Sequence, residues 1–153
     1  MKKLLAFFVA SAVSMSLFAQ SAGKISEIIA TKKATYGQAA YLTAVAMGDI
    51  KDNASYEDAL SVLKNKGVVA KDIDAGDVLD MKQLSWICAS AWNVEGSLML
   101  KLCNSPRYTF RQMKADEVID YSADPSDIPS GRNLLAVVTD CIARYQLKSG
   151  GAM

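Results

Sequence analysis

The chain has 153 residues, of which 17 are Lys or Arg, 16 are Asp or Glu and none is His. The near balance of charge excludes the strongly basic surface that nucleic-acid binding needs, and the absence of His removes the commonest general base. With 51% apolar residues, the chain is long enough to bury one substantial core, so we expect a single domain.

Residues 1–20 are typical of a secretory signal peptide. Lys2 and Lys3 precede the apolar stretch Leu4–Leu17, and small or polar residues follow over 19–22. The stretch is shorter than the roughly 20 residues that a membrane span requires, and no later segment reaches that length without charges. An uncleaved anchor is the alternative. We expect a cleaved leader, a periplasmic or extracellular protein, and no membrane span after cleavage.

After a lead-in over 21–34, whose phrase KISEIIATKK predicts a weak helical turn, one pattern occurs three times. A capping residue, Thr35, Asp80 or Ser130, is followed three positions later by an amide and then by an apolar run. Such a residue at a helix N-terminus accepts a hydrogen bond from a free backbone amide. The pattern predicts three apolar helices, of which the first covers about Tyr36–Met47. Repetition at a period of 45 to 50 residues favours stacked helical units.

A second phrase lies between the apolar helices and occurs twice. The segment beginning at Ser55 aligns without gaps with the one beginning at Ser105. Ser55 and Asp58 have the spacing of a capping box, and Ser105-Pro106 is a capping serine followed by proline at the first helical position. Both segments predict amphipathic helices. An insert over 94–104 predicts about one extra helical turn, because it is rich in leucine.

The predicted fold is therefore all-α. It is a compact stack of helix pairs in the order A-B-A-B-A, where A is the apolar and B the amphipathic helix. The domain covers residues 35–148, with a solvated loop over 121–129 and a flexible tail over 149–153.

The three cysteines leave alternatives open. Cys88 and Cys141 fall within predicted A helices, and Cys103 lies in the insert. Buried free thiols are favoured by the odd number and the apolar surroundings. One disulfide is the second possibility in an oxidising compartment, and a reactive nucleophile is the least favoured, because no base is available to activate it.

Acidic residues gather between the first B helix and the second A helix, over 72–80. Carboxylates in such a loop suggest calcium, but glycine stands at the fifth position, where an EF-hand-like loop has an acid. A solvated turn that ends in a helix cap is favoured. Adjacent acid pairs such as Asp116-Glu117 diverge on a helix and do not form an acid–base pair. We expect no catalytic residue, no metal site and no cofactor.

One group of residues is a candidate for binding a partner. Arg107, Tyr108, Arg111 and Lys114 lie on the second B helix at neighbouring positions, and Arg132 opens the next helix. Together they predict a cationic, aromatic-edged groove for a glycan, a phosphate or an acidic partner. A solvated helix face is the alternative.

Three large aromatic residues lie within or beside the A helices. Tyr41, Trp86 and Trp92 form either a platform on which a sugar stacks or part of the core. The core is favoured, because large aromatic side chains dominate packing.

The order of elements resembles the S-layer homology (SLH) repeat, in which a threonine-led helix, a second helix ending in glycine and an acidic loop follow one another. The segment SYEDALSVLKNKGVVAKDIDAGDVLDMKQLSWICASAW carries the resemblance, which covers roughly residues 35–143. It implies a stack of helix pairs and attachment to anionic cell-wall polysaccharide through a basic residue near the start of the A helix. Arg132 supplies that residue, and Lys82 is a partial substitute. The phrases SLMLKLCNSPRYTFRQM and SADPSDIPSGRNLL also look like those of uncharacterised secreted proteins of spirochaetes.

The sequence thus predicts a non-enzymatic, secreted protein of the bacterial cell envelope that binds or scaffolds another envelope protein. The alternative is an SLH-like module that binds a cell-wall glycan through the cationic groove.

Overall fold

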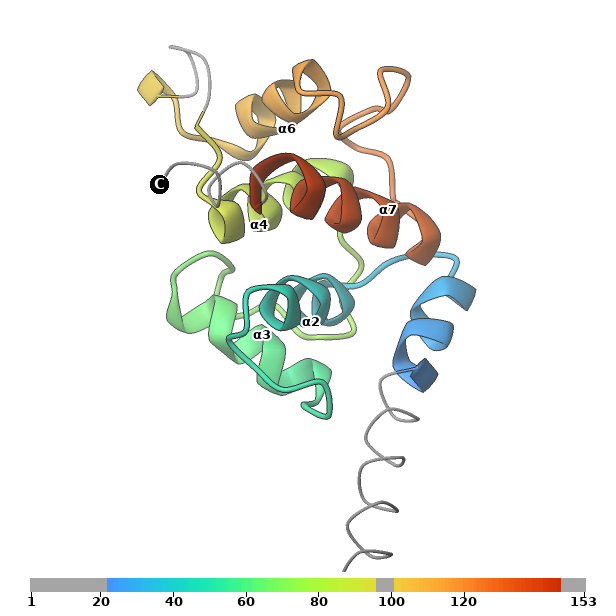
Figure 1. Ribbon diagram of the computed structural model, residues 1–153. Coiled ribbons are helices and arrows are strands. Elements are labelled where there is room, and N and C mark those ends of the chain that lie inside the picture. The colour runs from blue at the N-terminus through green and yellow to red at the C-terminus, as the bar shows by residue number, and fades with distance from the viewer. Residues whose placement is uncertain (1–21, 96–100, 147–153) are drawn as a thin grey trace, which may run out of the picture.

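The computed structural model describes residues 22–95 and 101–146, and over these ranges the protein is all-helical (Figure 1). The expected all-α fold is confirmed. The predicted signal peptide, the middle of the insert and the tail lie outside the described residues. Within them, the only β-type pairing is an isolated bridge between Thr35 and Val78. The main helices are an N-terminal helix over 22–30, α2 (Tyr36–Ala46), α3 (Tyr56–Asn65), α4 (Met81–Trp92), α6 (Pro106–Ala115), α7 (Gly131–Cys141) and a final π-helical turn, η1 (Ile142–Gln146). Residues 101–102 are also helical.

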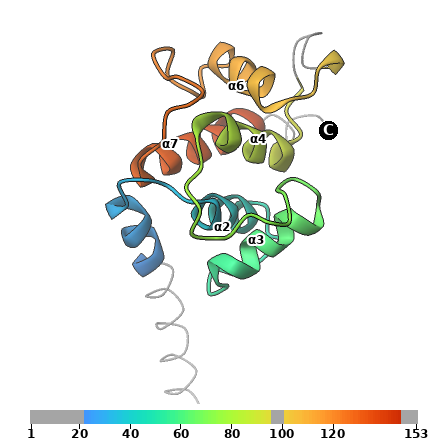
Figure 2. The same cartoon turned by 180° about the vertical axis from the view of Figure 1, so that it is seen from behind.

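The three A helices form the centre of the molecule. Each of α2, α4 and α7 contacts the other two, while α3 packs mainly on α2 and α6 mainly on α4. Figure 2 shows the same arrangement from behind, with the two B helices on the outside and the N-terminal helix beside the start of α7. Helix-pair packing is therefore confirmed. Tyr41 belongs to the core, with 2% of its surface exposed, and its hydroxyl donates to the Asp52 carbonyl at 2.6 Å.

Helix starts follow the predicted capping residues. Thr35 and Ser55 each form a capping box, with Gln38 and Asp58 as the reciprocal partners. Asp80 accepts from the Gln83 amide at 2.9 Å, and Ser130 accepts from the Asn133 amide at 3.2 Å. These bonds satisfy amides that the helix itself leaves free.

Ser105 departs from the prediction. It stands at the N-cap of α6 in an extended conformation, yet its side chain forms no capping bond. The helix still begins there, because Pro106 has no amide hydrogen to satisfy and its fixed φ suits the first helical position.

This contrast gives a testable expectation. Ser130→Ala should lower the free energy of unfolding by about 1 kcal/mol, because it removes a capping bond, whereas Ser105→Ala should change it by no more than about 0.5 kcal/mol. Urea unfolding followed by circular dichroism measures both. Equal losses in the two variants would contradict the assignment of the caps.

Within each of the first two helix pairs, backbone bonds join the start of the A helix to the loop that follows the B helix. In α2, the amides of Tyr36 and Gly37 donate to the carbonyls of Asp77 and Ala75 at 2.9 Å. The same arrangement occurs at the start of α4. The amides of Met81 and Lys82 in α4 donate to the carbonyls of Asp127 and Pro125, at 2.9 and 3.1 Å. Each loop after a B helix thus returns to cover the N-terminus of the A helix of its own pair.

The residues just before the three A-helix caps meet at the centre. Ala34, Leu79 and Pro129 are all almost fully buried. The Ala34 amide donates to the Pro129 carbonyl at 2.8 Å, and the Leu79 amide donates to the Ala34 carbonyl at 3.2 Å. A third bond from Pro129 to Leu79 would close the ring, but proline has no N–H. The residues before the three A-helix caps are therefore arranged with approximate threefold symmetry, in which one of the three backbone bonds is missing.

The N-terminal helix supplies the B helix of the third unit. The Gly131 amide at the start of α7 donates to the Thr31 carbonyl at 2.9 Å, as the other A helices do to their loops. Ile28 is fully buried in the common core. A Cβ placed on Gly131 would lie 1.6 Å from the Ile28 carbonyl oxygen, so the two backbones approach as closely as glycine permits. The N-terminal helix and α7, which are the first and last repeat helices, thus form one pair, although they lie about 100 residues apart in the sequence.

Candidate functional site

Four of the five predicted binding residues lie on α6. Arg107 and Arg111 are exposed, while Tyr108 and Lys114 are half-buried. The Arg111 guanidinium lies 5.8 Å from the centre of the Tyr108 ring, a distance typical of a cation–π contact. The ring supports the guanidinium from one side and leaves its N–H groups available to a partner.

Lys114 joins α6 to the turn that follows. Its ammonium group donates to the Ala123 carbonyl at 2.9 Å and lies 5.3 Å from the Phe110 ring and 5.0 Å from the Tyr121 ring. Tyr121 is nevertheless 89% exposed. A large aromatic ring is therefore presented at the surface, with the Lys114 cation in contact with one of its faces, which favours this position of the ring.

A shallow cavity of about 630 Å³ lies beside this ring. Its charge is mixed, because Glu117 and Asp120 lie in the wall with the two cations. The amide and hydroxyl of Ser122 donate to the Asp120 carboxylate, and these bonds lower its pKa from the ordinary 3.8. The carboxylate is thus ionised at neutral pH. The cavity is lined by Arg111, Lys114, Ala115, Glu117, Ile119, Asp120 and Tyr121.

Arg132 does not share that cavity. It lines a different hollow, of about 530 Å³, with Ile29 from the N-terminal helix and with Leu135 and Asp140 from α7. The structure therefore brings Arg111 and Lys114 together around one cavity, with Tyr108 beside Arg111, and places Arg132 at the junction between the first and last repeat helices.

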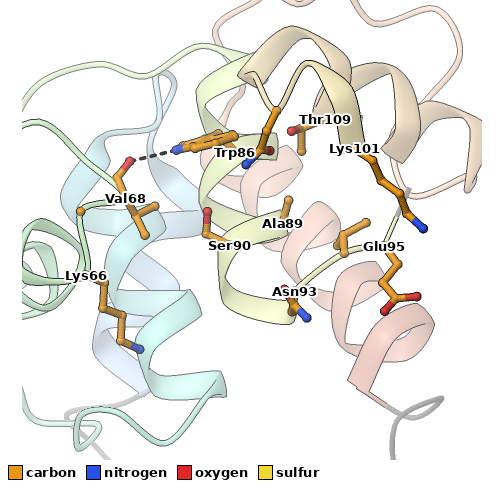
Figure 3. Close-up of a pocket in the computed structure, with 12 residues that line it drawn as sticks. Lys66, Val68, Trp86, Ala89, Ser90, Asn93, Glu95, Lys101 and Thr109 are labelled. Atoms are coloured by element: carbon orange, nitrogen blue, oxygen red, sulfur yellow. Dashed lines mark hydrogen bonds between the residues drawn. The ribbon is translucent and has the colours of Figure 1, made fainter. Parts of the chain in front are cut away.

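A second polar cavity, also of about 630 Å³, lies between the end of α3, the outer side of α4 and the start of α6 (Figure 3). Trp86 is half-buried in its wall, and its indole N–H donates to the Val68 carbonyl at 3.0 Å. Lys66 and Asn93 approach it from the two helix ends. The favoured prediction placed Trp86 in the core, but only Tyr41 of the three aromatics is fully enclosed; Trp92 is half-buried and donates to Gln146 at 3.3 Å.

The acidic loop over 72–80 forms turns. The Asp77 carboxylate accepts from the Asp74 amide at 2.8 Å, and 50 residues later Asp127 accepts from the Asp124 amide at the same distance. Among the described residues, no three His, Cys, Asp or Glu side chains gather in a way that could hold a metal ion. No helix within 22–95 and 101–146 is both long and apolar enough to span a bilayer.

Tyr121 is the binding candidate that sequence reasoning missed. The sequence placed it only in a solvated loop, although an aromatic residue at the start of an otherwise polar loop was a visible signal. Its position above Lys114 depends on the return of the loop, which the helical pattern does not encode.

A comparison with family models, with curated proteins and with solved structures gives no match.

Proposed function

We propose that this protein is a non-enzymatic binding or scaffolding module of the bacterial cell envelope, exported through its N-terminal leader, and that it contacts a protein partner. The contact surface is the α6 face, which we define as Tyr108, Arg111, Lys114 and Tyr121. The observation that carries the proposal is the 89% exposed Tyr121 ring held over Lys114.

The composition of the α6 face supports a protein partner. Tyr and Arg are enriched among the few residues that contribute most to protein–protein affinity. Here two cations and two tyrosines lie beside a cavity with both signs of charge. Such a surface suits a segment that presents an apolar group to Tyr121 and a carboxylate to Arg111. The chain has no His to act as a general base, which supports a role without catalysis.

The framework under the α6 face also supports binding. Phe110 and Met113 anchor α6 in the core, with 3% and 0% of their surfaces exposed. Lys114 fixes the following turn through Ala123. A preformed surface binds with less loss of conformational entropy than a flexible one.

Cross-linking in intact cells, followed by mass spectrometry, identifies the partner, and titration of the purified pair tests the face. Tyr121→Ala and Arg111→Ala should each weaken binding by about 10-fold or more, because both side chains would lie within the contact. Arg132→Ala is the matched control, since it removes an exposed cation that lines the other hollow. Unchanged affinity in the Tyr121 and Arg111 variants would contradict the proposed face.

Glycan binding is the second candidate, and the exposed Arg111 guanidinium over Tyr108 favours it, because this pair can hold an anionic sugar. Purified cell-wall sacculi distinguish the two functions. Loss of retention in the Arg107→Ala plus Arg111→Ala variant, which removes both exposed arginines of α6, would favour the glycan. Retention that this variant keeps would contradict glycan binding through α6.

A further inference from the structure

Two of the three cysteines meet at the centre of the helix stack. Cys88 lies in α4 and Cys141 at the end of α7, and both are 0% exposed. The two helices are in direct contact, and both residues belong to the same core cluster. Cys103, by contrast, is exposed.

The two thiols also contact each other. Their side chains lie within hydrogen-bonding reach, and this bond and the burial raise the pKa of Cys88 well above the ordinary 9.0. The bond in which Cys88 takes part thus favours its protonated form. Both are free thiols in the structure, and because they are neighbours on two helices in contact, a disulfide between them would require no change in the topology.

We propose that Cys88 and Cys141 form a disulfide as the protein folds in an oxidising compartment, and that Cys103 remains a free thiol. The inference rests on the proposed export of the chain for its setting in the cell, because disulfides persist outside the cytoplasm. The pairing itself rests on the positions of the two side chains.

The chemistry is a two-step thiol–disulfide exchange. The thiolate of one cysteine attacks a low-molecular-weight disulfide such as glutathione disulfide, forms a mixed disulfide and releases one glutathione thiolate. The thiolate of the second cysteine then attacks the protein sulfur of the mixed disulfide and releases the other glutathione. Cys88 and Cys141 together lose two electrons and two protons. Glutathione disulfide takes up the two electrons and the two protons and becomes two glutathione thiols.

The order of folding and oxidation follows from burial. In the finished fold neither sulfur is open to a bulky oxidant, and protonation keeps Cys88 unreactive. The exchange therefore takes place while α4 and α7 are still open to solvent. Once closed, the bond links positions 53 apart in the sequence, which restricts the unfolded chain and makes unfolding less favourable.

Refolding in a glutathione redox buffer tests the pairing without relying on export. The protein, expressed from its full-length sequence, is reduced, unfolded and refolded in the buffer. Remaining thiols are then alkylated in denaturant, and peptides are mapped by mass spectrometry without reductant. We expect a linked Cys88–Cys141 peptide and alkylation of Cys103 alone. Alkylation of all three cysteines, or any bridge that includes Cys103, would overturn the proposal.

Thermal unfolding provides a second measurement. Reduction should lower the Tm of the oxidised protein by about 10 °C, because the cross-link closes a long loop. Cys103→Ser should keep this difference, whereas Cys88→Ala plus Cys141→Ala should abolish it. A Tm that does not respond to reductant in the wild-type protein would count against the bond even if the double variant fails to fold. Isolation of the protein from the periplasm tests export separately, since a cytoplasmic protein that still oxidises correctly in the buffer contradicts only the location.

Discussion

Replacing Gly131 with Ala should lower the free energy of unfolding by about 3 kcal/mol or more. The added methyl group would stand 1.6 Å from the carbonyl oxygen of Ile28 and 2.6 Å from its carbonyl carbon. Both are backbone atoms, so no side chain can rotate away to make room. The N-terminal helix would have to move off α7, which would break the bond from the Gly131 amide to Thr31 and expose Ile28.

Gly76→Ala is the matched control. Gly76 lies in a turn with no atom within 4 Å of an added Cβ, and its φ is not in the left-handed region. The substitution should therefore change stability by no more than about 0.5 kcal/mol. Urea unfolding measures both variants, and hydrogen exchange of residues 22–30 shows whether that helix detaches. A Gly131→Ala protein as stable as the Gly76→Ala protein would contradict the pairing of the first and last repeat helices.

Leu134→Ala should cost about 3 kcal/mol, because it removes a fully buried side chain from α7 and leaves a cavity among the central helices. The residue faces the core that α2, α4 and α7 share. These helices cannot close around the gap without disturbing one another, since each contacts the other two.

The next residue provides the comparison. Leu135 is half-buried and lines the hollow that contains Arg132. Leu135→Ala makes the same change in helix propensity but removes less buried surface, so its cost should be less than half that of Leu134→Ala. If the two variants unfold at the same urea concentration, the orientation assigned to α7 is wrong.

The helices and their starts were predictable because their causes are local. Thr35, Ser55, Asp80 and Ser130 each bond to an amide three residues ahead, and that spacing is visible in the sequence. Gly48 and Gly67 end their helices with φ values of 74° and 71°, as a glycine at that position predicts. Ser105 stands at the predicted N-cap of α6, but its side chain forms no capping bond, because the sequence spacing permits such a bond without fixing the side-chain conformation that forms it.

The pairing of distant segments could not be predicted from the same signals. The phrase over 24–33 predicted only a weak helical turn, since it does not match the other B segments. Its role depends on contacts between Ile28 and Gly131, which lie 103 positions apart. The members of the α6 face could not be predicted for the same reason. The sequence grouped Arg132 with Arg111 because they follow one another along the chain, whereas the structure places Arg132 beside Ile29. For Cys88 and Cys141, helical periodicity placed both thiols in apolar helices but did not show that they meet.

The pairing of the first and last repeat helices also determines when the fold can be completed. A chain that emerges from its N-terminus presents the 22–30 helix about 100 residues before its partner α7. The pairs of α2 with α3 and of α4 with α6 involve neighbouring segments and can form early, whereas the last pair requires closure of nearly the whole domain. The apolar side of the 22–30 helix, including Ile28, must therefore remain without its partner until α7 has been synthesised. A protein built in this way acquires its full stability in one late step, and a chain truncated before residue 131 would keep two of its three helix pairs but lack the pair that joins its ends.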